Sequence, residues 1–171
     1  VAPAGGRTRP SAGIGQPFPE ERPWDLDLPK VSSYPTNLTE IRSYFEALIV
    51  GEIIVHPNGR TITEEHIAWT YRLLNTHPLH YDKVYAQSAK LSGTGETVVY
   101  GGLVFAWLCG LASRDTSENA LWDLGYTEGY HTQPAYAGDT VSALSRVLHK
   151  EDRSPRTGLV QIQLVGGKNI R

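Results

Sequence analysis

The feature that most constrains the fold is the run GGLVFAWLCGLASRD at residues 101–115. Wound as a helix, this run is apolar on nearly every side, and such a helix must be covered by the rest of the chain. It is shorter than the ~18 apolar residues that a membrane span needs. We therefore expect a central helix that is buried all round.

Two elements are expected before this helix. Residues 47–57 hold two apolar clusters around Gly51 and predict a bent strand that stops at Pro57. Residues 60–74 predict a helix with Thr63 as N-cap, because two glutamates follow where the helix dipole favours carboxylates. The apolar side chains at helical spacing are Ile67, Tyr71 and Leu74.

The expected elements beyond residue 82 complete the fold. Asp82 is a candidate cap for a short helix over 83–90, and strand-like runs cover residues 121–130, 140–150 and 158–167. The resulting order is strand, helix, polar loop, buried helix and antiparallel strands. It predicts an α+β domain in which an antiparallel sheet wraps around a central apolar helix.

The first forty residues differ from the rest of the chain. Residues 1–40 contain seven of the eleven prolines, which fix φ and remove backbone donors, so we expect an arm that is either extended or disordered. Residues 41–171 are expected to form the domain. The chain has no methionine, so we expect a processed product or a piece of a longer protein.

Net charge and cysteine content indicate which partners and which cellular compartment to expect. The net charge of -2 gives no strong field for nucleic acid or an anionic membrane, so neither is expected as a partner. Cys109 is the single cysteine, and no disulfide can form within the chain. A reducing compartment, the cytoplasm, is therefore the expected location.

The segment NTHPLHYD, residues 75–82, is unusually dense in titratable and polar groups. One interpretation is a catalytic loop. A second is a metal site made by His77, His80 and Asp82, although zinc sites on helices favour histidines four apart and Pro78 opposes regular helix. A third is an ordinary turn in which Asn75 caps the preceding helix and His80 is exposed.

Four stretches together point to a known family. From about Tyr44 to Asn169, the chain resembles the MaoC-like hot-dog dehydratases, which include the (R)-specific enoyl-CoA hydratases. The closest likeness is to the mesaconyl-CoA hydratase branch. The stretches that carry it are FEALIVGEIIVHPNGRTITEEHI, NTHPLHYD, YGGLVFAWLCGL and YAGDTVSALSRVL. The resemblance implies a hot-dog fold and pairing into a homodimer or higher oligomer. Some relatives hold two hot-dog units, so the resemblance offers one half of such a protein as an alternative for this chain.

The resemblance also implies site residues. The family's hydratase motif is Asp, any residue, Asn, Pro, an aliphatic residue and His, and it assigns the catalytic histidine to His80. The motif's Asp falls on Asn75 and its Asn on His77. A glycine at the start of the central helix, whose N–H polarises the thioester carbonyl, falls on Gly101 with Tyr100 in place of the family's His. Further substrate-binding candidates are Gly102, His77, Tyr100 and Asp82.

The implied activity is that of a hydro-lyase, which adds water to or removes it from a 2-enoyl-CoA thioester such as mesaconyl-CoA. His80 suits the role of base because imidazole titrates near neutrality, whereas the amide of Asn75 can only orient water. No metal or organic cofactor is needed, and coenzyme A enters as part of the acyl-CoA substrate. The alternative is a non-catalytic hot-dog unit that binds acyl-CoA or supports an active partner. A hot-dog thioesterase is a third option.

Overall fold

The computed structural model describes residues 43–89 and 93–170 of the chain. The expected arm over residues 1–40 lies outside these residues and stays a prediction. The helical elements are η1 (Phe45–Ala47), α1 (Glu64–Arg72), η2 (Pro78–His80), α2 (Lys83–Ala89) and α3 (Gly101–Thr116). The strands are β1 (Ile53–Thr61), β2 (Thr140–Ser154) and β3 (Thr157–Lys168). Within the described ranges, no helix combines the length and apolarity needed to cross a membrane.

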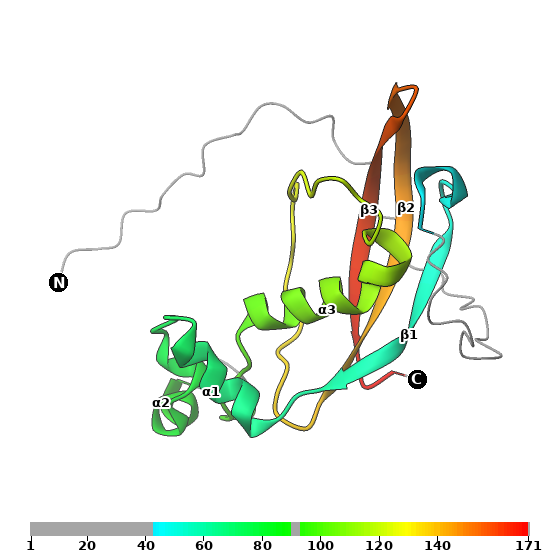
Figure 1. Ribbon diagram of the computed structural model, residues 1–171. Helices are drawn as coiled ribbons and strands as arrows, with labels where there is room; N and C mark the ends of the chain where they lie inside the picture. The colour runs from blue at the N-terminus through cyan, green and yellow to red at the C-terminus, as the bar shows by residue number, and fades with distance from the viewer. Residues whose placement is uncertain (1–42, 90–92, 171) are drawn as a thin grey trace, which may run out of the picture. The chain divides into compact units, whose positions relative to one another are not determined.

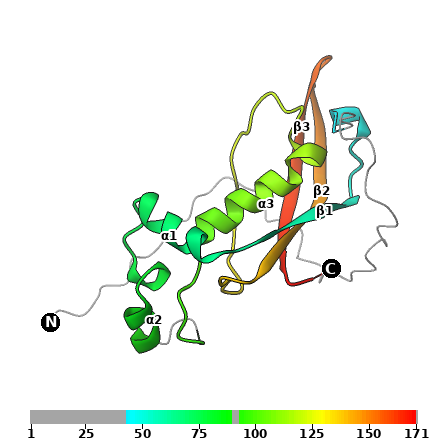
Figure 2. The same cartoon turned by 60° about the horizontal axis from the view of Figure 1, so that its bottom comes forward.

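The three strands form one antiparallel sheet in the order β1-β2-β3. Strands β2 and β3 form a hairpin closed by the turn at Pro155 and Arg156, where Ser154 pairs with Thr157. Helix α3 contacts all three strands and lies against one face of the sheet (Figures 1 and 2). The predicted α+β arrangement of an antiparallel sheet around an apolar helix is confirmed in this packing.

Strand β1 departs from its predicted end. It runs through Pro57 to Thr61 instead of stopping at the proline. The pairing register with β2 shifts between Val55 and Gly59, so Pro57 falls in a bulge where the ladder does not require its missing N–H. The first half of the predicted bent strand was wrong, because residues 47–52 contain the end of η1 and a turn instead of a strand. In this turn Gly51 has a φ of +88°, a conformation that favours glycine.

Helix α1 begins as predicted but buries a different face. Thr63 is its N-cap residue, with Glu64 and Glu65 in the first turn. Tyr71 and Leu74, two of the three predicted apolar contacts, are exposed. The buried residues are His66, Ile67 and Thr70. The prediction of this face was wrong because Leu74 lies beyond the helix, with a φ of +61°.

Two predictions around α3 also need correction. The helix has the predicted position, but Phe105, Ala106 and Gly110 are exposed, so this chain does not bury it all round. Residues 121–130 form no strand; Asp123 Oδ1 instead accepts a hydrogen bond from the Gly125 N–H in a tight turn. Several large apolar side chains of this segment are exposed: Leu121, Trp122, Leu124, Tyr126 and Tyr130.

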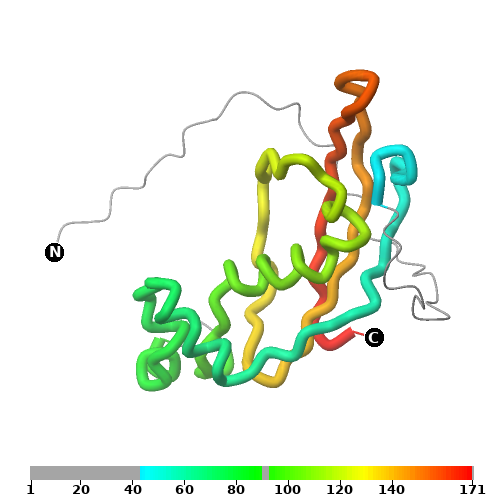
Figure 3. Tube along the Cα trace, in the orientation of Figure 1, coloured from blue at the N-terminus to red at the C-terminus, as the bar shows by residue number. Residues whose placement is uncertain are grey.

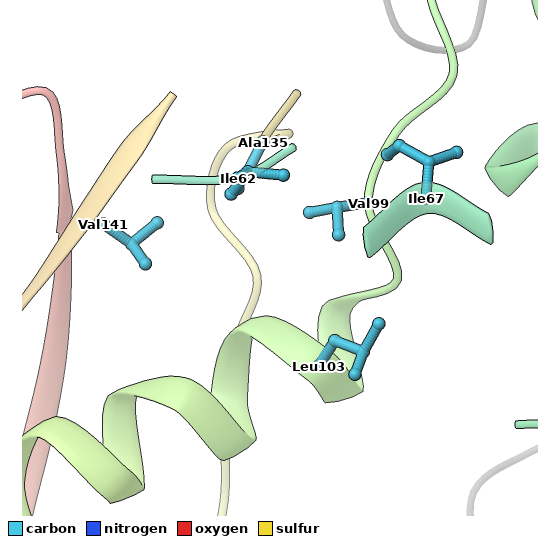
Figure 4. Packing of buried hydrophobic residues seen from close by; sticks show 6 residues of the cluster. All are labelled: Ile62, Ile67, Val99, Leu103, Ala135 and Val141. Carbon is cyan, nitrogen blue, oxygen red and sulfur yellow. The ribbon is translucent and has the colours of Figure 1, made fainter. Parts of the chain in front are cut away.

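The hydrophobic core gathers at the beginning of α3. Leu103 from the first helical turn packs with Ile67 of α1 and Val141 of β2 (Figure 4). The remaining buried members of this cluster are Ile62, Val99 and Ala135. Because these residues come from segments far apart in the sequence, the core fixes the helix start relative to the loops around it.

A buried polar network holds the other end of α3 to the sheet. The His56 ring lies in the β1 bulge, fully buried, with Nδ1 2.8 Å from Asp115 Oδ2 of α3. Its Nε2 lies 2.9 Å from Ser145 Oγ of β2. Since a carboxylate only accepts, His56 Nδ1–H donates to Asp115; when the ring is neutral, the hydroxyl of Ser145 donates to Nε2. Ser145 is 0% exposed, so this Ser–His–Asp arrangement is a structural connection and no substrate reaches the hydroxyl.

We expect Ser145→Ala to lower the free energy of unfolding by about 1–3 kcal/mol, because it leaves buried His56 Nε2 without a donor. The control is Ser142→Ala, on the same strand, whose hydroxyl makes no hydrogen bond within the described residues. Urea unfolding compares the two variants. Equal stability of Ser145→Ala and Ser142→Ala would show that the network contributes nothing.

The start of α1 provides a pH test. His66 Nδ1 accepts a hydrogen bond from the Thr63 N–H at 2.9 Å, and burial together with the charge of Arg60 lowers the His66 pKa. The unfolded chain therefore binds a proton at higher pH than the folded one, so stability is complete above about pH 6.5 and falls as pH drops through that value. In His66→Gln, which keeps an acceptor at this capping position, we expect the acid-dependent loss over this range to shrink in urea titrations at pH 5 and 7.5.

Candidate active site

The loop over residues 75–82 is a tight turn built by its own polar side chains. Asn75 Oδ1 accepts a hydrogen bond from the His77 N–H at 2.9 Å, and His77 Nδ1 accepts from the Leu79 N–H at 3.3 Å. These bonds lead the chain into η2, which ends at His80. The side chain of Asn75 thus organises the residues that follow it and does not cap α1.

His80 is half-buried and held in one orientation. Its Nδ1 lies 2.9 Å from the carbonyl oxygen of Val98, which can only accept, so Nδ1 carries the proton in the neutral ring. The Val98 N–H donates in turn to the Leu79 carbonyl at 3.2 Å. The free lone pair is therefore on Nε2, and a ring fixed in this way can take a proton from a neighbouring water.

Tyr100 connects His80 to the start of α3. Its ring centroid lies 5.7 Å from that of His80, and Tyr100 is the N-cap residue of the helix. A Cβ at Gly102 would come within 2.7 Å of the Tyr100 ring. Glycine at this position therefore lets the ring lie close against the first turn of α3.

The first N–H groups of α3 are free to bind a ligand. The carbonyl of Tyr100 accepts from Leu103 and Val104, while the N–H groups of Gly101 and Gly102 have no partner among the residues that the structure describes. They lie at the positive end of the helix dipole. This is the arrangement that stabilises negative charge on an oxygen.

Sequence reasoning missed one residue at this position, His131. A Cβ on Gly101 would lie 2.6 Å from His131 Nε2 and 2.7 Å from Cε1, so the imidazole edge faces the helix start. His131 follows directly after the run that was wrongly predicted as a strand. No local pattern marks it, because only the return of the chain toward α3 brings it to Gly101.

The other predicted site residues, His77 and Asp82, lie at the surface. His77 is exposed, with its ring centroid 5.9 Å from that of His80. Asp82 is exposed and accepts from the Tyr85 N–H at 2.9 Å, which confirms it as the cap of α2. Three metal-ligand side chains do not converge anywhere in residues 43–89 and 93–170. The site thus combines His80, Tyr100 and the helix start.

Comparisons with known proteins identify the family that the chain resembles. The family described as mesaconyl-CoA hydratase matches residues 34–168. The chain is similar to a mesaconyl-CoA hydratase of Cereibacter sphaeroides, with 36% identity over 122 residues that cover 70% of this chain and 34% of the relative. It is also similar to a beta-methylmalyl-CoA dehydratase of Chloroflexus aurantiacus, with 33% identity over 126 residues that cover 72% of this chain and 35% of the relative.

A solved structure supports the fold. A MaoC domain protein dehydratase from Chloroflexus aurantiacus aligns with a TM-score of 0.65 and 32% identity over 74% of this chain and 36% of that protein. The likeness confirms the predicted hot-dog fold. The chain spans about a third of the length of these relatives.

The hydrogen bond to Val98 predicts the tautomer of His80. In a ¹⁵N NMR spectrum recorded at alkaline pH, where imidazole rings are neutral, we expect the Nδ1–H form of His80, with the lone pair on Nε2. His149, an exposed imidazole on β2, serves as the reference for a ring without such a bond to a carbonyl. A dominant Nε2–H form of His80 would remove the basis for its assignment as a base.

Proposed function

The chain belongs to the mesaconyl-CoA hydratase family, and on this premise we propose that it carries the site of an acyl-CoA hydratase or dehydratase. The observation that supports this most strongly is the fixed imidazole of His80, with its free Nε2, beside the N–H donors at the start of α3. Addition of water to an enoyl thioester needs a base for the water and donors for the thioester oxygen. The site offers both.

The proposed reaction begins when His80 Nε2 takes a proton from water and the water oxygen bonds to C3 of the enoyl group. The electron pair of the C2=C3 double bond moves toward the thioester, and negative charge develops on its oxygen. The N–H groups of Gly101 and Gly102 stabilise this charge. C2 then takes the proton from His80, the carbonyl re-forms, and one water has been added.

We propose a branched dicarboxylic acyl group such as mesaconyl as the substrate. The support is the activity named for the two relatives, a mesaconyl-CoA hydratase and a beta-methylmalyl-CoA dehydratase. The proposed chemistry uses only acid–base groups and backbone donors, so coenzyme A enters as part of the substrate and no separate cofactor is assigned. Cys109 is a free thiol, as suits the proposed cytoplasmic location.

We further propose that this unit functions next to another hot-dog unit, in the same polypeptide or in a second copy. The exposed side of α3, including Phe105, and the exposed side chains of Leu121, Trp122 and Leu124 favour this. Large apolar side chains of this number on one segment are typical of a covered surface. The limited share of the relatives that the chain spans is consistent with such a neighbour.

A second candidate function is acyl-CoA binding without turnover. It is favoured by Asn75, which stands where the family motif has an acid and whose Oδ1 already accepts from the His77 N–H. The two functions differ in outcome. A binder retains mesaconyl-CoA in a calorimetric titration while the enoyl absorbance of the bound thioester stays constant.

For the hydratase, we expect His80→Ala to lower kcat for mesaconyl-CoA by ~10² to 10⁴, the usual contribution of a general base. Loss of enoyl absorbance measures the rate, and circular dichroism checks the fold. His149→Ala removes an exposed imidazole away from the site and should keep the wild-type rate. Full activity of folded His80→Ala would exclude His80 from the reaction.

A further inference from the structure

His131 is an imidazole at the helix start that the proposed reaction does not use. Its Nε2 edge faces Gly101, at 2.6 Å from the position of an added Cβ. Among the residues that the structure describes, its ring nitrogens make no hydrogen bond, and the residue is exposed. A polar side chain in this place would contact any group that approaches the helix start.

The segment that carries His131 is fixed on both sides. After α3 the chain runs back past the helix to the beginning of β2 (Figure 3). On one side, the ring of Tyr126 packs edge-on against Phe105 of α3, with centroids 4.8 Å apart. On the other, the carbonyl of buried Ala135 accepts from the Val99 N–H at 2.9 Å, and Lys168 Nζ donates to the Pro134 carbonyl at 3.0 Å.

These contacts attach the segment that carries His131 to the same short stretch that orients His80. Val98 holds the His80 ring through its carbonyl, and the next residue, Val99, holds the returning chain. The positions of both imidazoles therefore depend on hydrogen bonds made by Val98 and Val99, two consecutive residues just before α3. Such a frame can place a side-chain donor beside the backbone donors before a substrate arrives.

An imidazole beside the helix start can contribute to the reaction by stabilising the negative charge that develops on the substrate. During hydration the negative charge builds on the thioester oxygen, and the N–H groups of Gly101 and Gly102 reach it from the helix side only. A donor from a side chain can complete the coordination of that oxygen, as in other oxyanion sites.

We propose that His131 is a catalytic residue whose Nε2–H donates a hydrogen bond to the thioester oxygen of the bound acyl-CoA. The proposal rests on the function proposed above and adds a residue to the same site. His131 keeps its proton throughout: His80 takes the proton of water and returns it to C2, while His131 only stabilises the enolate-like oxygen.

Kinetics of the full protein test this role. We expect His131→Ala to lower kcat for mesaconyl-CoA by ~10², the typical effect of losing one oxyanion donor, with KM changed by less than about threefold. His131→Gln places an amide N–H near the position of Nε2 and should recover about tenfold of the lost rate. The matched control, His149→Gln, should keep the wild-type kcat. Unchanged kcat in His131→Ala, or His131→Gln no faster than His131→Ala, would overturn the proposal.

A second measurement separates this proposal from the proposed function. Butyryl-CoA has the thioester but no double bond, so it reports contact without turnover. We expect the ¹⁵N signal of His131 Nε2, assigned by its loss in His131→Gln, to shift when butyryl-CoA is added. A shift in a protein that hydrates no enoyl-CoA would support the contact and refute the hydratase. Normal hydration without a shift would refute the role of His131 alone.

Discussion

The position of α3 on the sheet is the constraint on which the rest of the site depends. At its far end, Asp115 is tied to the buried ring of His56, which is in turn bound to Ser145 of β2. At its near end, Leu103 packs into the core with Val141. A helix held at both ends behaves as a rigid rod, so the N–H groups of Gly101 and Gly102 have a fixed place.

Two chain segments lie against that helix start, and each is held by a hydrogen bond to a backbone group of Val98 or Val99. The loop that ends at His80 is attached to Val98, and the segment that carries His131 is attached to Val99 through Ala135. Attachment through main-chain groups leaves the imidazole nitrogens that face the site without other partners. These hydrogen bonds therefore stabilise the two segments and also leave imidazole nitrogens unoccupied beside the N–H donors of α3.

The apolar surface of this unit follows from the composition of α3. Residues 101–115 are apolar on nearly all sides, but a three-stranded sheet covers one side of the helix only. Phe105 therefore remains exposed, next to Tyr126 of the returning segment. The remaining apolar side of α3 belongs to the surface that we propose another hot-dog unit covers.

Short sequence patterns were enough to locate two helix starts, the helix α3 and the candidate base. Thr63 and Asp82 mark helix starts by interactions within four residues, and the apolar run marks α3. The motif around His80 located the candidate base. Such features are readable because their partners are close in the sequence.

Only the tertiary structure decided the rest. The bulge that carries β1 through Pro57 depends on the register with β2, and the exposure of Tyr71 depends on which face of α1 meets the core. His131 stands in a run without periodicity, more than twenty residues from the helix start that it faces. Its place follows from the path of the whole segment, which long-range contacts such as that between Val99 and Ala135 select and no short pattern encodes.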